Sequence, residues 1–249
     1  MPIDTNSFCW NGIVSTDADA ARSFYADVIG WVAVDHTFPS GETTTMFFTG
    51  ETARGHLRAP QSEGEPNHWT SYLRVDDVAA SVASAEASAG GVLVPATDID
   101  PGTFAAVTSP SGIVLCLFHE ADEASAENAP AGVGSVNWTE LQSRDIEADL
   151  PWLKAAFGFE LSEMEIPNGT YYMLNSGGKP RGGAVAAFRE EIAGRWLAWI
   201  QTDDIDEAVG RVTAGGGSVV AQPFVHPGVG RLAMVADPTG ATFGLIAPD

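Results

Sequence analysis

The sequence predicts an α+β fold built from four tandem copies of one module, a strand followed by a helix and several more strands. Two observations predict it. Short motifs recur at a fixed spacing, and each recurrence repeats the same order of strand-like and helix-like hydrophobic patterns. The chain has 249 residues, of which 45% are hydrophobic, so it is long enough for one large or two small domains with an ample core.

The coarse repeat divides the chain into two halves. The motif around Gly30 recurs around Gly158, and the motif around Pro110 recurs around Pro238, so both recur 128 residues later. Repetition of unrelated motifs at one spacing indicates a duplicated domain rather than chance similarity.

Each half divides again, because Asp17 and Asp76 both follow a strand-like run and open a helix. We therefore predict one domain over residues 1–120 and a second over residues 135–249, each with two modules. The segment between them, residues 121–134, is acidic and Ala-rich, which is typical of a linker.

The predicted helices carry apolar stripes at helical spacing. In the first, Ala21 and Val28 belong to such a stripe, and a glycine ends the helix. The third helix contains Pro151, which is tolerated only in a first turn. We therefore expect this helix to begin nearer Asp149 than Asp145.

Charge and composition exclude several classes of protein. The chain has 12 Lys and Arg against 33 Asp and Glu, a net charge of −21, which disfavours binding to nucleic acid or to an anionic membrane surface. No apolar run is long enough for a transmembrane helix, and the N-terminal residues lack the features of a signal peptide. Cys9 and Cys116 alone form no disulfide framework, so we expect a reduced, cytoplasmic protein.

Three segments resemble a known family. WNGIVSTDADAARSFYADVIGW, from residue 10, resembles the opening of vicinal-oxygen-chelate proteins, the glyoxalase, bleomycin-resistance and extradiol-dioxygenase superfamily. DPTGATFGLIAPD, from residue 237, resembles that family's final strand, and SPSGIVLCLFHE matches it more loosely. The resemblance covers nearly the whole chain and is greatest to two-domain members labelled hydroxylase or glyoxalase-like. It implies βαβββ modules paired into two half-open barrel domains, each around a cavity.

The resemblance also implies where a metal would bind. The family's enzymes hold a divalent metal through His, Gln or Glu on the first and last strands of the modules. In this chain those positions, or their nearest residues, are Trp10, His56, Thr70, Cys116, Trp138, Ala184, Leu197 and Gly244. Because few of these side chains are metal donors, we expect no metal and no other cofactor. A weaker alternative is a metal held off the family positions by His56, His68 and His119.

Strand alternation predicts which side chains line the cavities with these positions. They combine aromatic walls with a few polar groups, as small-molecule pockets do. The candidate ligand-binding residues are Trp10, His68, Thr70, Tyr72, Arg74, Cys116, Trp138, Glu140, Gln142, Trp199 and Gln201.

Glu140 is also the candidate catalytic residue, as a general base or a ligand-orienting acceptor, because a carboxylate inside a barrel is costly unless it is paired. Its structural alternative is a salt bridge to Arg181 or Lys179. Arg74 also has two possible partners, an anionic ligand or Glu51. The two tryptophans at family metal positions are equally consistent with core packing.

We therefore expect a metal-free protein that binds a small hydrophobic or aromatic molecule, in sequestration, resistance or an accessory metabolic role, as a monomer or homodimer. The alternative is an enzyme of the same superfamily, a glyoxalase-like lyase or a dioxygenase or hydroxylase. It would use Glu140 for acid–base chemistry, or a metal held by off-pattern histidines. A purely structural interaction module is the third hypothesis.

Overall fold

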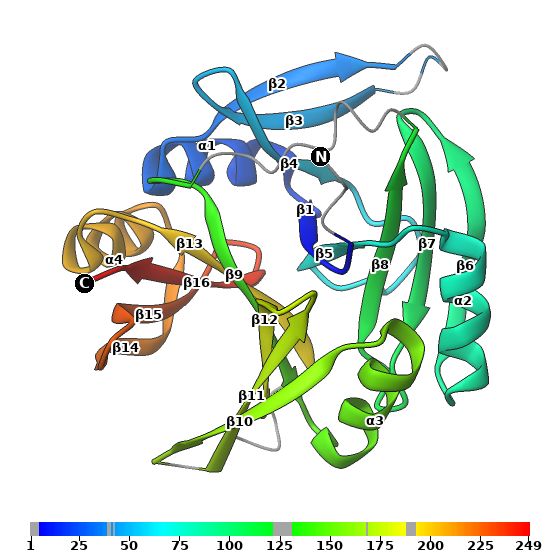
Figure 1. Ribbon diagram of the computed structural model, residues 1–249. Coiled ribbons are helices and arrows are strands. Elements are labelled where there is room, and N and C mark those ends of the chain that lie inside the picture. The colour runs from blue at the N-terminus through cyan, green and yellow to red at the C-terminus, as the bar shows by residue number, and fades with distance from the viewer. Residues whose placement is uncertain (1–4, 39–40, 42, 122–130, 168, 188–192) are drawn as a thin grey trace. The chain divides into compact units, whose positions relative to one another are not determined.

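A computed structural model describes residues 5–38, 41, 43–121, 131–167, 169–187 and 193–249 (Figure 1). It confirms the predicted α+β class with four modules of strand, helix and three strands. Most of the predicted linker, residues 122–130, lies outside the described residues. None of the described helices is both long enough and apolar enough to cross a membrane.

The modules follow one another without rearrangement. The first comprises β1 (Phe8–Val14), α1 (Ala18–Ile29), β2 (Val32–Thr37), β3 (Thr43–Thr49) and β4 (Thr52–Arg58). The second comprises β5 (His68–Arg74), α2 (Val78–Ala87), β6 (Gly91–Ile99), β7 (Gly102–Thr108) and β8 (Val114–Glu120). The third comprises β9 (Val136–Ser143), α3 (Ile146–Phe157), β10 (Glu160–Ile166), β11 (Gly169–Ser176) and β12 (Lys179–Ala186). The fourth comprises β13 (Arg195–Gln201), α4 (Ile205–Ala214), β14 (Ser218–His226), β15 (Gly230–Ala236) and β16 (Thr242–Ala247).

The strands form two mixed sheets of eight, one per half of the sequence. Their orders are β2-β3-β4-β1-β5-β8-β7-β6 and β10-β11-β12-β9-β13-β16-β15-β14. In every module the first strand pairs in parallel with the last one, and the strands between them are antiparallel. The two outermost strands of each sheet leave it open at both edges, which agrees with half-open rather than closed barrels.

Each helix begins at an aspartate cap, as the repeats predict, but in α2 the cap is Asp77 rather than the expected Asp76, because it is the Asp77 side chain that accepts from the Ala80 backbone N–H. In α1, Asp17 accepts a hydrogen bond from the Ala20 backbone N–H at 3.0 Å, and Gly30 ends the helix in the left-handed conformation with φ of 74°. The prediction for α3 was wrong, because Asp145 caps it and Pro151 lies in its interior.

A buried aspartate explains why α3 begins early. Asp149 is fully buried within the helix, and it accepts hydrogen bonds from the hydroxyls of Ser111 and Ser143, both at 2.6 Å. The Ser111 backbone N–H is a further donor at 3.1 Å. These bonds fix the first turns of α3, so the helix continues through the proline despite the lost backbone bond.

The described residues form two compact units. Unit 1 comprises the described parts of Met1–Trp10, Ser71–Asn128 and Trp138–Trp196, which hold most of the second and third modules. Unit 2 comprises the described parts of Asn11–Thr70, Ala129–Asn137 and Leu197–Asp249, which hold most of the first and fourth modules. Each unit therefore combines segments from both halves of the sequence.

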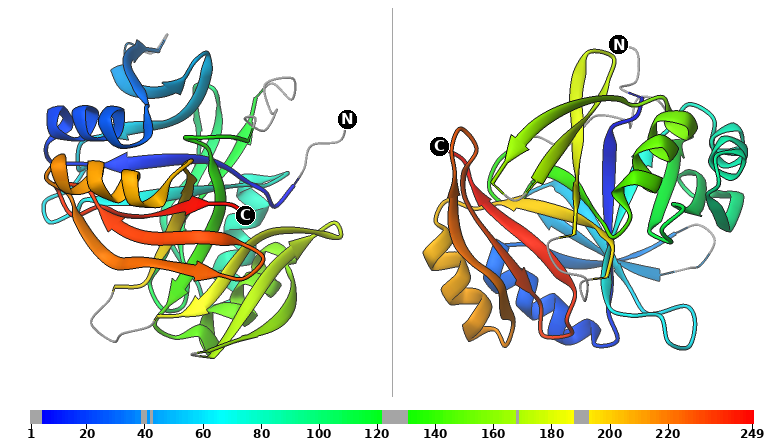
Figure 2. Two further views of the ribbon diagram at one scale, coloured as in Figure 1. Left: turned by 90° about the vertical axis from the view of Figure 1, so that its left-hand side faces the viewer. Right: turned by 90° about the horizontal axis from the view of Figure 1, so that it is seen from below.

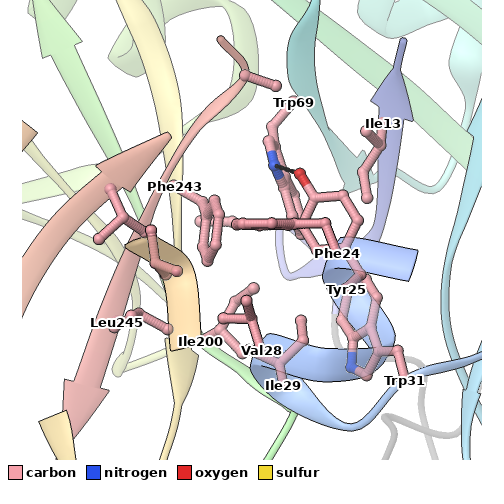
Figure 3. Packing of buried hydrophobic residues seen from close by; sticks show 14 of the residues in the cluster. Ile13, Phe24, Tyr25, Val28, Ile29, Trp31, Trp69, Ile200, Phe243 and Leu245 are labelled. Atoms are coloured by element: carbon pink, nitrogen blue, oxygen red, sulfur yellow. Dashed lines mark hydrogen bonds between the residues drawn. The ribbon is translucent and has the colours of Figure 1, made fainter. Parts of the chain in front are cut away.

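The core of unit 2 forms around an aromatic cluster where α1 and α4 pack together (Figures 2 and 3). Tyr25 lies at its centre, and its hydroxyl accepts a hydrogen bond from Trp69 Nε1 and donates one to Asp237 Oδ2, both at 2.9 Å. Its ring centroid lies 5.7 Å from that of Phe243. Burial of these large rings is the main stabilising contribution here.

The core of unit 1 is built in the same way from α2 and α3, which lie side by side (Figures 1 and 2). Trp152 of α3 is buried, and its indole N–H donates to the backbone oxygen of Ala85 in α2 at 3.2 Å. Leu141 of β9 and Leu174 of β11 belong to the same core. Because side chains alternate along a strand, the neighbours of Leu141 point to the opposite face of the sheet.

Candidate functional site: a tryptophan–tyrosine–glutamate network

The opposite face of β9 carries the densest set of predicted site residues. Trp138, Glu140 and Gln142 alternate with core residues along the strand, and Glu140 and Gln142 are 7% and 2% exposed. Glu140 lies in register with Gly183 of β12, the parallel neighbour of β9. The inward position on β12 is therefore Gly183 rather than Ala184, which packs in the core of unit 1.

Hydrogen bonds join these side chains into one network through Tyr171 of β11. Trp138 Nε1 donates to the Tyr171 hydroxyl at 2.7 Å, and that hydroxyl donates to the Glu140 carboxylate. Gln142 Nε2 donates to Glu140 Oε1 at 3.0 Å. We call Trp138, Glu140, Gln142 and Tyr171 the β9 network. It places a carboxylate among aromatic rings, with its orientation fixed by two donors.

The electrostatics of the network favour a neutral phenol at Tyr171. Burial, and next the neighbouring charge of Glu140, raise the pKa of Tyr171 well above its usual value. Tyr171 therefore stays protonated and keeps its donor directed at the carboxylate.

Gly183 makes room for this arrangement. A Cβ atom at this position would lie 1.9 Å from the Tyr171 hydroxyl oxygen, so the phenol occupies space that any other residue would take. The repeat could have indicated this, because Gly183 takes the place of His56, 127 residues earlier. Tyr171 is not among the candidates that the sequence analysis named.

Arg74 has a different partner from either one expected. Its guanidinium forms a buried ion pair with Glu120, with Nη2 to Oε1 at 2.6 Å and Nε to both carboxylate oxygens at 3.0 Å. The expected pairing with Glu51 was wrong, because β8 ends with Glu120 beside the end of β5. Both charges are largely neutralised by this pair.

Other candidates of unit 1 lie around this ion pair. Tyr72 is in register with Cys116 of β8, and its ring centroid lies 5.8 Å from that of Phe104. Cys9 donates its thiol to the backbone oxygen of Tyr72 at 3.6 Å, and burial raises the pKa of that thiol to about 12. The Cys9 thiol is therefore protonated and unreactive at neutral pH. Trp10, the next residue of β1, is partly buried.

In unit 2, Thr70 and His56 meet over Gly12. A Cβ atom on Gly12 would lie 2.5 Å from Thr70 Oγ1 and 2.9 Å from His56 Nε2. Burial, followed by the charge of Arg58, lowers the pKa of His56 to about 4, so the imidazole is neutral at pH 7.

The remaining candidates are separate from these groups. The indole of Trp199 covers Gly244, with which it is in register. The side chain of Gln201 accepts a hydrogen bond from Asn137 Nδ2 at 2.7 Å. His68 Nδ1 and His119 Nδ1 each lie within hydrogen-bond distance of a backbone oxygen, at 2.6 Å and 2.9 Å.

The family's metal does not fit these residues. Within the part of the chain that the structure describes, no group of three or more His, Cys, Asp or Glu side chains is arranged to hold a metal ion. His56, His68 and His119 therefore form no such group. Stable sites need three or four converging donors, so we derive no chemistry through a metal.

Comparison with known proteins assigns the family. The model of the Glyoxalase/Bleomycin resistance protein/Dioxygenase superfamily matches residues 8–117 and 135–245. The chain belongs to this superfamily. A Mycobacterium tuberculosis (strain CDC 1551 / Oshkosh) protein named "Putative glyoxylase CFP32" is 32% identical over 96% of this chain and 94% of its own length. The Anthracycline biosynthesis protein DauV of Streptomyces sp. (strain C5) is 28% identical over 95% of this chain and 91% of its own length.

Solved structures show the same fold. The Mn(II)-bound glyoxalase from Novosphingobium aromaticivorans superimposes with a TM-score of 0.67 and 19% identity, covering 98% of this chain and 82% of that one. That protein is described as bound to Mn(II).

Proposed function

We propose that this superfamily member binds a small, partly aromatic organic molecule at the β9 network, without a metal. The observation that carries the proposal is the network itself, in which a buried carboxylate lies among aromatic rings on the face of β9 that points away from the core. Aromatic rings supply contact area, and one fixed acceptor orients a ligand that has a hydrogen-bond donor.

The curated relatives agree with such a ligand class. DauV is named for anthracycline biosynthesis, and anthracyclines are polycyclic aromatic compounds. A sequestration, resistance or accessory metabolic role is consistent with that relative and with a metal-free site.

Tryptophan fluorescence tests the proposal directly, because Trp138 belongs to the network. We expect 2-naphthamide, a planar aromatic amide with hydrogen-bond donors, to quench fluorescence saturably, before and after chelator treatment. We expect Glu140→Gln to weaken binding about tenfold, which corresponds to about 1.4 kcal/mol. Tyr172→Phe, on the same strand as Tyr171, is the control and should bind as the wild type does. Linear, non-saturable quenching would refute the proposal, and a requirement for added Mn²⁺ or Zn²⁺ would refute its metal-free part.

A second candidate function is proton-transfer catalysis by Glu140. It is favoured by the two donors that hold its carboxylate in a fixed orientation, as a general base requires. Proton NMR in D₂O tests it with 2-acetylnaphthalene, whose methyl hydrogens are weakly acidic. Catalysis would exchange these hydrogens for deuterium, and Glu140→Gln would slow the exchange at least a hundredfold. If the hydrogens exchange no faster than in buffer without protein, catalysis is refuted and only the binding role remains.

A further inference from the structure

Arg195, the first residue of β13, is a cation for which the described residues supply no counter-ion. The guanidinium is partly buried, and its Nε is out of contact with solvent and meets no acceptor among the described residues. Burial is the cause that lowers its pKa, with no contribution from a carboxylate of the described chain. The contrast with Arg74, which forms a buried ion pair with Glu120, shows what a satisfied guanidinium looks like in this fold.

An unsatisfied buried donor is costly, and more so when the group is charged. Such a group persists when something outside the folded chain accepts its hydrogen bonds. The chain carries a net charge of −21, so carboxylates are plentiful, yet none of those described lies against Arg195.

Arg195 lies on the same face of the sheet as the β9 network. Its neighbour Trp196 is 3% exposed and belongs to the core of unit 1, so Arg195 points to the opposite face. Strands β9 and β13 are adjacent in the sheet. The two backbone segments run close together there, since a Cβ atom on Gly194 would lie 3.5 Å from the backbone oxygen of Gln142.

We propose that Arg195 binds an anionic group, a carboxylate, on the ligand whose aromatic part contacts the β9 network. This inference rests on the proposed function and narrows its ligand class to aromatic acids. A guanidinium offers parallel N–H donors that match the two oxygens of a carboxylate. In a strongly acidic protein, an unpaired cation also selects where an anion can bind.

A matched pair of ligands separates the two proposals. The compounds 2-naphthoate and 2-naphthamide have the same rings and nearly the same shape, but only the first is charged at pH 7.5. We expect the wild-type protein to bind 2-naphthoate at least tenfold more tightly than 2-naphthamide. We expect Arg195→Gln to abolish that preference while its affinity for 2-naphthamide changes less than threefold.

The control is Arg144→Gln, which removes the same charge from an exposed position just after β9 and should keep the preference. If the wild type binds both compounds equally, the inference about Arg195 fails and the proposed function stands. If neither compound binds, both fail.

Thermal denaturation gives a readout that is independent of fluorescence. Because Arg195→Gln replaces a partly buried, unpaired charge with a neutral side chain, we expect its Tm without ligand to equal or exceed that of the wild type. At one fixed concentration, 2-naphthoate should raise the wild-type Tm by more than it raises the Tm of the variant. A variant that melts well below the wild type would indicate that Arg195 has a structural partner, and would overturn the inference.

Discussion

At the scale of single residues, the chain uses one arrangement twice, in which an indole N–H donates to a tyrosine hydroxyl that donates to a carboxylate. In unit 2, Tyr25 stands between Trp69 and Asp237 within the aromatic core. In unit 1, Tyr171 links Trp138 to Glu140 on the face that points away from the core. The first arrangement lies within a hydrophobic core, and the second lies on the face where we propose that the ligand binds.

Tyr171→Phe tests how firmly this second arrangement is held. The change removes the hydroxyl that accepts a hydrogen bond from Trp138 Nε1 and donates one to the Glu140 carboxylate. Because both hydrogen bonds are lost, we expect the free energy of unfolding to fall by about 1–3 kcal/mol. Urea denaturation followed by circular dichroism measures the change. Tyr172→Phe is the matched control on the same strand, because its ring packs against the core of unit 1. Equal losses in both variants would contradict the role given to Tyr171.

His56 predicts a pH dependence of stability. Its pKa is about 4 in the folded protein against 6.5 for an ordinary histidine. Below pH 6.5 the unfolded chain gains a proton that the folded chain does not accept. Stability therefore falls as the pH drops from 6.5 to 4, by about 3 kcal/mol at most, and is fully present above 6.5.

Chemical denaturation at pH 7.5 and pH 5 measures this contribution. We expect His56→Gln to lose less stability between these two values than the wild type loses, while His36→Gln, at an exposed position of β2, behaves as the wild type does. The lowered pKa values of Asp35 and Glu65 remove stability only below about pH 4.5, outside this window. Parallel pH profiles for the wild type and His56→Gln would show that His56 is not buried in its neutral form.

At the scale of elements, the paired first and last strands of a module tend to place a glycine opposite a larger residue. In three modules, one member of a registered central pair is a glycine, which leaves space for the side chain of the facing residue or of a neighbour. The pairs are Gly12 with His56, Gly183 with Glu140, and Gly244 with Trp199. The glycine is on the first strand in the first module and on the last strand in the other two. The strand that carries the glycine therefore differs between modules.

Two glycine-to-alanine changes should therefore have opposite effects. Gly183→Ala places a methyl group 1.9 Å from the present position of the Tyr171 oxygen, so the phenol must move and stability falls by about 1–3 kcal/mol. Gly210→Ala lies in α4 with open space around the new methyl group, and it should raise stability by about 0.5–1 kcal/mol. Urea denaturation of both variants measures the difference. A neutral Gly183→Ala would mean that Tyr171 is free to adopt another position.

Sequence reasoning predicted the elements well and their fine contacts poorly. Asp17 and Asp145 mark true helix starts because capping is a local interaction that adjacent residues determine. The start of α3 was nevertheless predicted wrongly, because Asp149 is held in part by Ser111, which is 38 residues away in the sequence. The partner of Glu140 could not be predicted for the same reason, since Tyr171 comes from a strand two places away in the sheet.

At the scale of the whole molecule, the repeats established four modules but could not indicate which helices share a core. The helix stripes are all apolar and of similar width, so nothing in them specifies a partner. The structure packs α1 with α4 and α2 with α3, which joins segments from opposite halves of the sequence in each unit. Such packing is determined by three-dimensional complementarity, which a pattern of hydrophobic residues does not contain.

The net charge of −21 leads to a final prediction, that moderate salt stabilises the folded protein. With 33 acidic and 12 basic side chains, most carboxylates have no cation to pair with, and folding brings them closer together. Raising sodium chloride from 10 mM to 150 mM shortens the Debye length from about 30 Å to about 8 Å, which weakens this repulsion. Surface pairs such as Arg231 with Asp206 are weakened too, but exposed ion pairs of this kind contribute little to stability. We therefore expect Tm to rise between these two salt concentrations. Each kcal/mol gained in the free energy of unfolding corresponds to a rise of about 2–4 °C. Differential scanning calorimetry measures it, and the same rise in potassium chloride but not in an equal osmolarity of sucrose would identify screening as the cause. A Tm that falls with salt would mean that the ion pairs outweigh the repulsion among the remaining carboxylates.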